Sequence, residues 1–306
     1  MSAHSIAEPA VDIAAAKPVR RPWIWATGVV VVVLCAQIVQ LLVTNPNFEW
    51  PVVAAHLLDP SILRGVYNTC ILTVWGMLLG IVLGGVLALL KMSDSRLLRS
   101  IASGYIWVFR GTPELVQLIF WFNIGLVLPQ IGLGIPFGPL LISAEANDVI
   151  TPIVAAVIGL GFHEAAYQAE IYRAGFLSVP NGPLEAARSL GMNPVAVFFR
   201  VRLPLAARFI VPPMFNQVIG MTKGTSLVSV IGGSELLFSV QEIYNETFQT
   251  IPLLIVACIW YLVITSVLNV CQHFIERHYG RSSRPIAATR TAVPNAPAAT
   301  RGDDDE

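Results

Sequence analysis

Charged residues are scarce in this chain, which argues against an ordinary water-soluble domain. Lysine, arginine, aspartate and glutamate make up 12% of its 306 residues, whereas about a quarter is usual in soluble domains. Hydrophobic residues make up 55%, so the composition favours a membrane protein. The formal net charge is zero, so no overall field would attract nucleic acid, and none is expected as a partner.

The chain has four cysteines and no nucleotide-binding motif, which argues against a metal site and an ATP site. Cys35, Cys70, Cys258 and Cys271 lie in apolar stretches without metal-ligand spacing, so we expect small buried residues and no metal site. The pattern GxxxxGK[ST] is absent, so we expect no ATP site in this chain. No nucleophile–base pair is specific enough to support an integral membrane enzyme, and no cofactor is expected.

Six long apolar stretches are present, at about residues 23–44, 66–90, 101–128, 150–172, 206–232 and 252–274. A helix needs roughly 20 apolar residues to cross the hydrocarbon of a membrane. We therefore predict an all-α fold, a polytopic membrane helix bundle of about six transmembrane helices. The third stretch is overlong and contains Pro113. Its first part therefore lies along the membrane surface, or the helix is broken within the membrane; both outcomes stay open.

Glycines recur every four residues in the second stretch, at Gly76, Gly80 and Gly84, with Gly85 beside the last. Such small-xxx-small spacing lets another helix approach closely. We expect this face to pack within the chain in preference to forming a dimer.

Basic residues are distributed unevenly between the two sides of the predicted bundle. One side would carry Lys17, Arg20, Arg21, Lys91, Arg96, Arg99, Arg173, Arg188, Arg200, Arg202, Arg208, Arg277, Arg281 and Arg284. The loops of the other side carry Arg64 alone. Because cytoplasmic loops are enriched in lysine and arginine, both termini are predicted to be cytoplasmic. The tail after about Arg284 is rich in Ala, Pro and Thr and is predicted to be disordered.

A short polar segment joins the fourth and fifth stretches. Pro183 suits the first turn of a helix, and Glu185 would lie near its positive end. Gly191 suits a left-handed stop, and Asn193 with Pro194 suits a new helix start. Two interpretations are open: a device that docks a partner, or an amphipathic helix lying on the membrane surface.

Residues 185–204 read EAARSLGMNPVAVFFRVRLP and resemble the cytoplasmic EAA loop of ABC importer permeases. The matching positions are Glu185, Ala186, Ala187, Gly191, Leu203 and Pro204, while Val201 replaces the usual isoleucine. Three more segments resemble the polar amino acid branch of these permeases. RGTPELVQ at 110–117 resembles RGTPLLVQ, AYQAEIYRAG at 166–175 resembles AYxAEIxRGG, and KGTSLVSVI at 223–231 resembles KDTSLVSVI with Gly224 in place of aspartate.

The resemblance, to the permease subunit of a bacterial type I ABC importer of the polar amino acid uptake family, implies an ABC transmembrane type-1 permease domain at 66–275 with a cytoplasmic coupling (EAA) helix. An extra transmembrane helix and outer loop would occupy 23–65, and cytoplasmic tails would occupy 1–22 and 276–306. The subunit would lie in the cytoplasmic (inner) membrane and pair with itself or a related permease. It would dock on a dimer of ABC ATPase subunits, which hydrolyse the ATP, and receive a polar amino acid from an extracytoplasmic binding protein. The six EAA positions named above would form the coupling contact.

Polar residues within three of the stretches form candidate stripes for a substrate path. Residues at i, i+4 and i+7 share one helix face, as do Arg110, Glu114 and Gln117 on the third stretch and His163, Tyr167 and Glu170 on the fourth. The candidate path residues are Glu114, Gln117, His163, Tyr167, Glu170, Asn216, Lys223, Thr225 and Ser226. Carboxylates would meet the ammonium of a zwitterion, and cations its carboxylate.

The alternative for each polar residue is a partner on another helix that holds the bundle together, such as Arg173 or Arg110 for Glu170. For His163 we favour a hydrogen-bonded interior residue over a proton relay. At the level of function, a secondary transporter or channel for small polar solutes would use the same stripes without an ATPase. That alternative leaves the EAA loop unexplained.

Overall fold

The computed structural model describes residues 22–134 and 140–280, and the chain divides into two compact units, Met1–Trp50 and Pro51–Glu306. The described part of the first unit contains helix α1 (Pro22–Thr44) and a short 3-10 helix, η2 (Pro46–Phe48). The side chain of Asn45 caps η2 by accepting from the backbone N–H of Asn47. The predictions for residues 1–21 and 281–306, including the disordered tail, concern positions outside the described residues.

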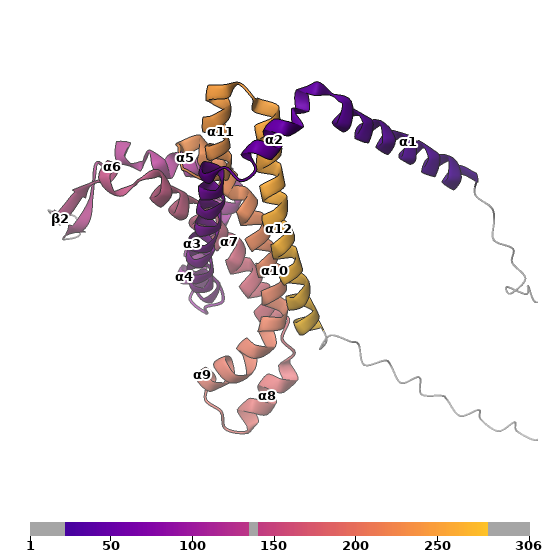
Figure 1. The fold of residues 1–306 in the computed structure, drawn as a ribbon. Helices are drawn as coiled ribbons and strands as arrows, with labels where there is room; N and C mark the ends of the chain where they lie inside the picture. Colours follow the sequence, from indigo (N-terminus) through magenta and orange to yellow (C-terminus); the bar gives the residue numbers. More distant parts are fainter. Residues whose placement is uncertain (1–21, 135–139, 281–306) are drawn as a thin grey trace, which may run out of the picture. The chain divides into compact units, whose positions relative to one another are not determined.

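The second unit is a bundle of helices with one two-stranded hairpin (Figure 1). Its α-helices are α2 (Trp50–His56, which starts at the unit boundary), α3 (Pro60–Lys91), α4 (Arg96–Gly111), α5 (Glu114–Phe122), α6 (Ala146–Val149), α7 (Pro152–Leu177), α8 (Asn181–Ser189), α9 (Pro194–Val197), α10 (Leu203–Gly224), α11 (Leu236–Thr247) and α12 (Thr250–Gly280). The shorter turns are η3 (Ile124–Leu126), the π-helical η4 (Phe198–Arg202) and η5 (Thr225–Ile231). Strands β1 (Gln130–Gly134) and β2 (Leu140–Glu145) pair antiparallel. The predicted helix bundle is confirmed, and the hairpin is an addition that the sequence analysis did not anticipate.

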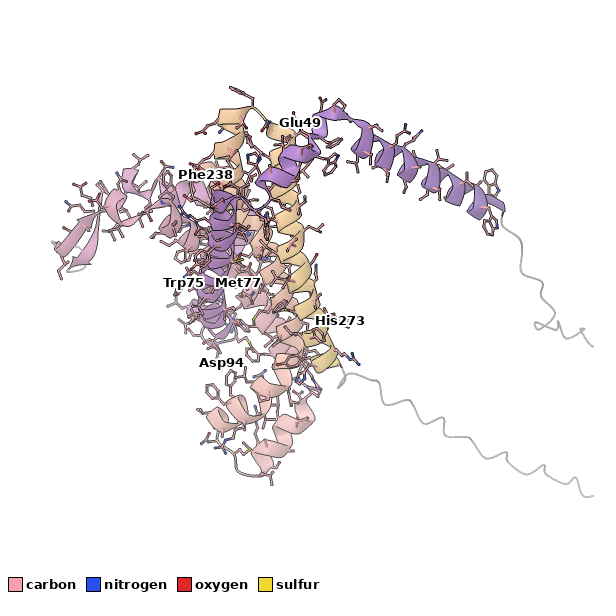
Figure 2. The ribbon with its side chains drawn as sticks, viewed as in Figure 1. Glu49, Trp75, Met77, Asp94, Phe238 and His273 are labelled. Atoms are coloured by element: carbon pink, nitrogen blue, oxygen red, sulfur yellow. The ribbon has the colours of Figure 1, made fainter. Side chains whose placement is uncertain are left out.

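Small residues form the contact between α3 and α7. A Cβ added at Gly80 would lie 2.8 Å from Cγ of Glu164, and one added at Gly161 would lie 2.7 Å from Cδ2 of Leu79. Figure 2 shows Trp75 and Met77 on α3; Trp75 is exposed whereas Met77 is buried in the core. The glycine face of α3 therefore packs within the chain, as predicted.

The third apolar stretch, 101–128, is broken at Pro113, as one of the two outcomes left open for it had it. It divides into α4 and α5 at Thr112 and Pro113, both of which have extended backbones. Pro113 lacks the N–H that would reach the carbonyl of Phe109, and the residue before a proline is disfavoured in the helical region. The amide Nε2 of Gln117 donates to that carbonyl instead, at 3.0 Å, and so satisfies the group that the break exposes.

The two ends of the second unit carry different structures (Figure 1). The α8–α9 loop extends from one end, and α11 lies at the other; Asp94 and Phe238 mark these ends in Figure 2. Helix α11 lies between the fifth and sixth predicted stretches, 206–232 and 252–274, where no helix was predicted. The carboxylate of Glu235 caps it by accepting from the backbone N–H groups of Leu237 and Phe238, and it also accepts from the hydroxyl of Tyr261.

Three described helices are long and apolar enough to cross a membrane: Trp25–Thr44, Pro60–Lys91 and Thr250–Tyr279. The remaining predicted spans are broken, as in α4 and α5, or carry charged side chains within α7 and α10.

Cys35, Cys70, Cys258 and Cys271 are all exposed, so the prediction that they are buried is wrong. Apolar stretches of membrane helices can face lipid, and lying in such a stretch does not place a residue in the protein core.

We predict that Gly84→Ala loosens the contact between α3 and α7. The added Cβ would lie 2.6 Å from Cβ of Gln168 and 2.9 Å from the carbonyl oxygen of Ala165. Overpacking of this kind costs about 1–3 kcal/mol, so the thermal unfolding midpoint of the purified protein should fall. Gly85→Ala is the matched control, because its Cβ would lie 3.8 Å from Tyr172. Equal midpoints for both variants would contradict the prediction.

Candidate functional site

The loop between α7 and α10 is a compact helical hairpin. Helix α8 begins at Asn181, so Glu185 lies beyond its first turn and not at the helix start that we predicted. Gly191 follows the end of α8 and has a φ of 77°, in the left-handed region. The backbone N–H of Met192 then donates to the carbonyl of Ala187 at 3.2 Å. The side chain of Asn193 caps α9 by accepting from the N–H of Ala196 at 2.7 Å, as predicted.

The hairpin presents one face outward and holds the other against the bundle. Leu184 and Ala187 are buried in a cluster with Phe176. Glu185 and Ala186 are exposed, Gly191 and Pro204 are exposed, and Leu203 is partly buried. The small side chain of Ala187 therefore allows close packing inside this chain, while Glu185 and Ala186 are the members of the EAA triplet that a partner could touch.

Two cavities that share lining residues lie between α4, α5, α7 and α10. The first has a volume of about 220 Å³ and is lined by Glu114, His163, Glu164, Tyr167, Gln217, Gly220 and Met221. The second has a volume of about 470 Å³ and is lined by Arg110, Tyr167, Glu170, Ile171, Ala174, Phe209, Pro213, Asn216 and Gln217. Tyr167 and Gln217 line both. Along α7 and α10 the lining residues follow one another at helical spacing, so we describe the two cavities together as one track. Asn216 and Gly220 are exposed, so the track is open at the surface of this chain.

Glu164 is the most buried charged residue of the track. Its side chain is 5% exposed, and its carboxylate accepts from the amides of Gln168, at 2.8 Å, and Gln217, at 3.4 Å. Both donors are neutral, so the described residues give this carboxylate hydrogen bonds without a counter-charge. Oε1 of Gln168 is buried without a hydrogen-bond partner.

Arg110 and Glu170 bring both charge signs to the larger cavity. The guanidinium of Arg110 lies 5.1 Å from the centroid of the Tyr167 ring, a cation–π contact. The carboxylate of Glu170 pairs with Lys91 at the end of α3 and, at 2.9 Å, with Arg173. Glu170 therefore both joins α3 to α7, as the interhelical alternative proposed, and lines the cavity.

The candidate path residues separate into three groups. Glu114, His163, Tyr167, Glu170 and Asn216 line the two cavities. Gln117 and Thr225 are buried and bonded to the backbone near them, Gln117 at the helix break and Thr225 to the carbonyl of Thr222. Lys223 and Ser226 line a different cavity, of about 370 Å³, with Tyr261. Nδ1 of His163 lies 3.3 Å from Oε1 of Gln117, which fits the hydrogen-bonded interior histidine that we favoured.

Glu164 and Gln217 are polar lining residues that the predicted path omitted. Glu164 directly follows His163 in sequence, whereas nothing in the sequence around Gln217 marks it as a lining residue. Arg110 and Glu114 were predicted to share one helix face, yet they lie on α4 and α5 because Pro113 breaks the helix. Within residues 22–134 and 140–280, no three His, Cys, Asp or Glu residues are grouped to hold a metal ion.

We predict that Lys91→Met and Glu170→Gln are coupled in their effect on stability. Lys91→Met leaves Glu170 paired with Arg173 alone, and Glu170→Gln leaves Lys91 without its carboxylate. The double change removes both members of the Lys91–Glu170 pair. Contacting charged pairs give interaction energies of about 0.5–3 kcal/mol in such cycles, so the double variant should lose less stability than the sum of the single changes. Thermal unfolding of the four purified proteins measures this. Additive losses would contradict it.

Comparison with known proteins places this architecture in a family. The family described as "Binding-protein-dependent transport system inner membrane component" matches residues 76–281. The arginine transport system permease protein ArgU of Corynebacterium glutamicum is 40% identical over 280 residues, covering 91% of this chain and 87% of that protein. The histidine/lysine/arginine/ornithine transport system permease protein HisQ of Escherichia coli is 32% identical, covering 71% of this chain and 92% of that protein. A crystal structure of an amino acid ABC transporter with histidines is similar with a TM-score of 0.60 and 33% identity, covering 72% of this chain and 94% of that one. The chain therefore belongs to the inner membrane components of binding-protein-dependent transport systems.

Proposed function

We propose that the chain is the membrane-spanning subunit of an ATP-driven importer that moves polar amino acids across the cytoplasmic membrane. The observation that carries this proposal is a track lined by charged side chains in a helix bundle that exposes many large apolar side chains. The larger cavity, of about 470 Å³, has the size of a small-molecule site, for which about 300–1,000 Å³ is usual. Relatives named for arginine, and for histidine, lysine, arginine and ornithine, support a polar amino acid as the substrate class.

The charges along the track fit a zwitterion. Arg110 lines the larger cavity and forms no ion pair among the described residues, so it is available to a carboxylate. Glu114 and Glu164 line the smaller cavity and are available to an ammonium group. Charged groups inside membrane bundles are costly, and they commonly mark substrate paths. Glu114, His163, Tyr167, Glu170 and Asn216 are the proposed path residues that the cavities retain.

The proposed partners follow from the exposed hairpin. Helix α8 presents Glu185 and Ala186 outward at the end of the bundle away from α11. We assign to this face the contact with a dimer of ABC ATPase subunits, which would hydrolyse the ATP. A second permease subunit and an extracytoplasmic amino-acid-binding protein complete the proposed assembly. Packed elements that move as rigid bodies would carry the motion of the ATPase into the bundle.

The orientation and the division of the chain remain proposals. The α8–α9 hairpin and both termini would be cytoplasmic, because lysine and arginine concentrate on that side. The permease domain would span 66–275, with 23–65 as an additional helix and outer loop. The tails at 1–22 and 276–306 would lie in the cytoplasm; α12 runs to Gly280, so the first residues of the second tail are helical.

We predict that Glu185→Arg abolishes ATP-dependent uptake while the protein still inserts into the membrane. The reversed charge would lie on the exposed face of α8, where the ATPase is proposed to dock. Like-charge contacts at an interface cost several kcal/mol, so the ATPase should no longer co-purify with the variant. Uptake into proteoliposomes that contain the assembled complex, together with the yield of bound ATPase, measures both effects.

Asp94→Arg is the matched control for that experiment. Asp94 is exposed on the turn between α3 and α4, so the change reverses the same charge at the same end of the bundle (Figure 2). Uptake by this control should remain close to normal. Normal uptake by Glu185→Arg, with no ATPase bound, would instead favour a secondary transporter.

A further inference from the structure

The carboxylate of Glu114 lies beside Gly224, where α10 passes into η5. A Cβ added at Gly224 would lie 3.5 Å from Oε1 and 3.7 Å from Oε2 of Glu114. Both positions depart from the family segments, which have leucine at the first (RGTPLLVQ) and aspartate at the second (KDTSLVSVI). An aspartate at 224 would bring a second carboxylate against Glu114, and like charges at that separation repel. The chain thus carries on α5 the carboxylate that the family segment carries at 224.

Glu114 lacks a partner among the described residues. It is partly buried, lines the smaller cavity, and forms no ion pair or hydrogen bond there. No lysine or arginine lines the described part of this cavity. An ionisable group in a membrane bundle usually pairs with another group. The absence of such a group among the described residues therefore indicates a transient partner, such as a transported substrate.

The charges of the whole track can be compared with those of a substrate. Glu170 is already paired with Lys91 and Arg173, which leaves Arg110, Glu114 and Glu164 without a counter-charge in the described structure. We count His163 as a neutral residue, because its Nδ1 lies 3.3 Å from Oε1 of Gln117 in the interior. A neutral amino acid offers one carboxylate and one ammonium group. Its carboxylate would pair with Arg110 and its ammonium group with one of the two glutamates. The other glutamate gains a counter-charge when the substrate carries a second cation on its side chain.

We propose that Glu114 is a specificity-determining residue that receives the guanidinium or ammonium group of a substrate side chain, and that Gly224 leaves room for it. Glu164 then receives the α-ammonium group, and Arg110 the α-carboxylate. The substrate class is amino acids with a positively charged side chain. This inference rests on the proposed transport function and narrows it.

L-Arginine and L-citrulline provide the test, because they have nearly the same shape and differ in side-chain charge. The full chain, assembled with its ATPase subunits in lipid nanodiscs without the binding protein, is titrated with each amino acid in a calorimeter. The unchanged complex should bind L-arginine at least about tenfold more tightly than L-citrulline, as is typical when a buried charge loses its partner. Glu114→Gln should bring the two affinities to within about threefold, with the loss falling on L-arginine.

Two further variants separate selectivity from folding and from net charge. Glu114→Leu combined with Gly224→Asp moves the carboxylate back to the family's position and should recover at least half of the preference for L-arginine on a logarithmic scale. Glu246→Gln removes one exposed negative charge from α11, outside the cavities, and should leave the preference unchanged. The thermal unfolding midpoints of all variants should stay close to that of the unchanged complex.

Several results would overturn the proposal. One is an unchanged preference for L-arginine in Glu114→Gln; another is a preference that stays lost in the double variant. Absence of binding of both amino acids to the unchanged complex would also overturn it. The proposed function is tested separately by uptake in the complete system with the binding protein present. Uptake of amino acids there, with no selectivity at Glu114, refutes the inference alone, whereas no uptake of any amino acid refutes both.

Discussion

The close approach of α3 to α7 is the constraint on which the rest of the bundle depends. Gly76, Gly80 and Gly84 remove side chains from one helix where α7 must lie, and Gly161 does the same on the other. Association of helices in a membrane gains little from the hydrophobic effect, so packing at short range must stabilise it. The same contact sets the position of Glu164, whose stem lies against Gly80. A structural face and a functional face thus share one helix.

The polar side chains of α7 are stabilised in an apolar surrounding because each one contacts a different partner. Glu164 is hydrogen-bonded by amides, Glu170 is neutralised by Lys91 and Arg173, and Tyr167 receives the guanidinium of Arg110. Each partner comes from a different position in the chain, so the cavities exist only in the folded bundle. Ion pairing offsets the desolvation cost of burying Glu170, whereas no counter-charge in the described structure offsets that cost for Glu114 and Glu164.

The sequence predicted the helical class, the packing of the glycine face and the caps of the α8–α9 hairpin, because each depends on local spacing or on one residue's backbone preference. It did not predict which polar residues meet. Thr225 and Gln117 are polar enough to contact a substrate, but their side chains donate to backbone carbonyls at nearby helix ends instead. Gln217 had no unusual neighbours in sequence, and only the crossing of α10 over α7 brings it to both cavities. The β1–β2 hairpin and α11 lie outside the six long apolar stretches, and the prediction of helices rested on those stretches.

The interruption at Thr112 and Pro113 has a mechanical consequence. The polypeptide connects α4 to α5 without a continuous ladder of backbone bonds, and the side chain of Gln117 spans the gap by donating to Phe109 and Thr112. A side-chain amide can exchange one acceptor for water, whereas a helix cannot bend as sharply without losing its own bonds. Among the described residues, no helical hydrogen bond fixes the angle between α4 and α5, so the packing of each helix against α7 sets the separation of Arg110 and Glu114.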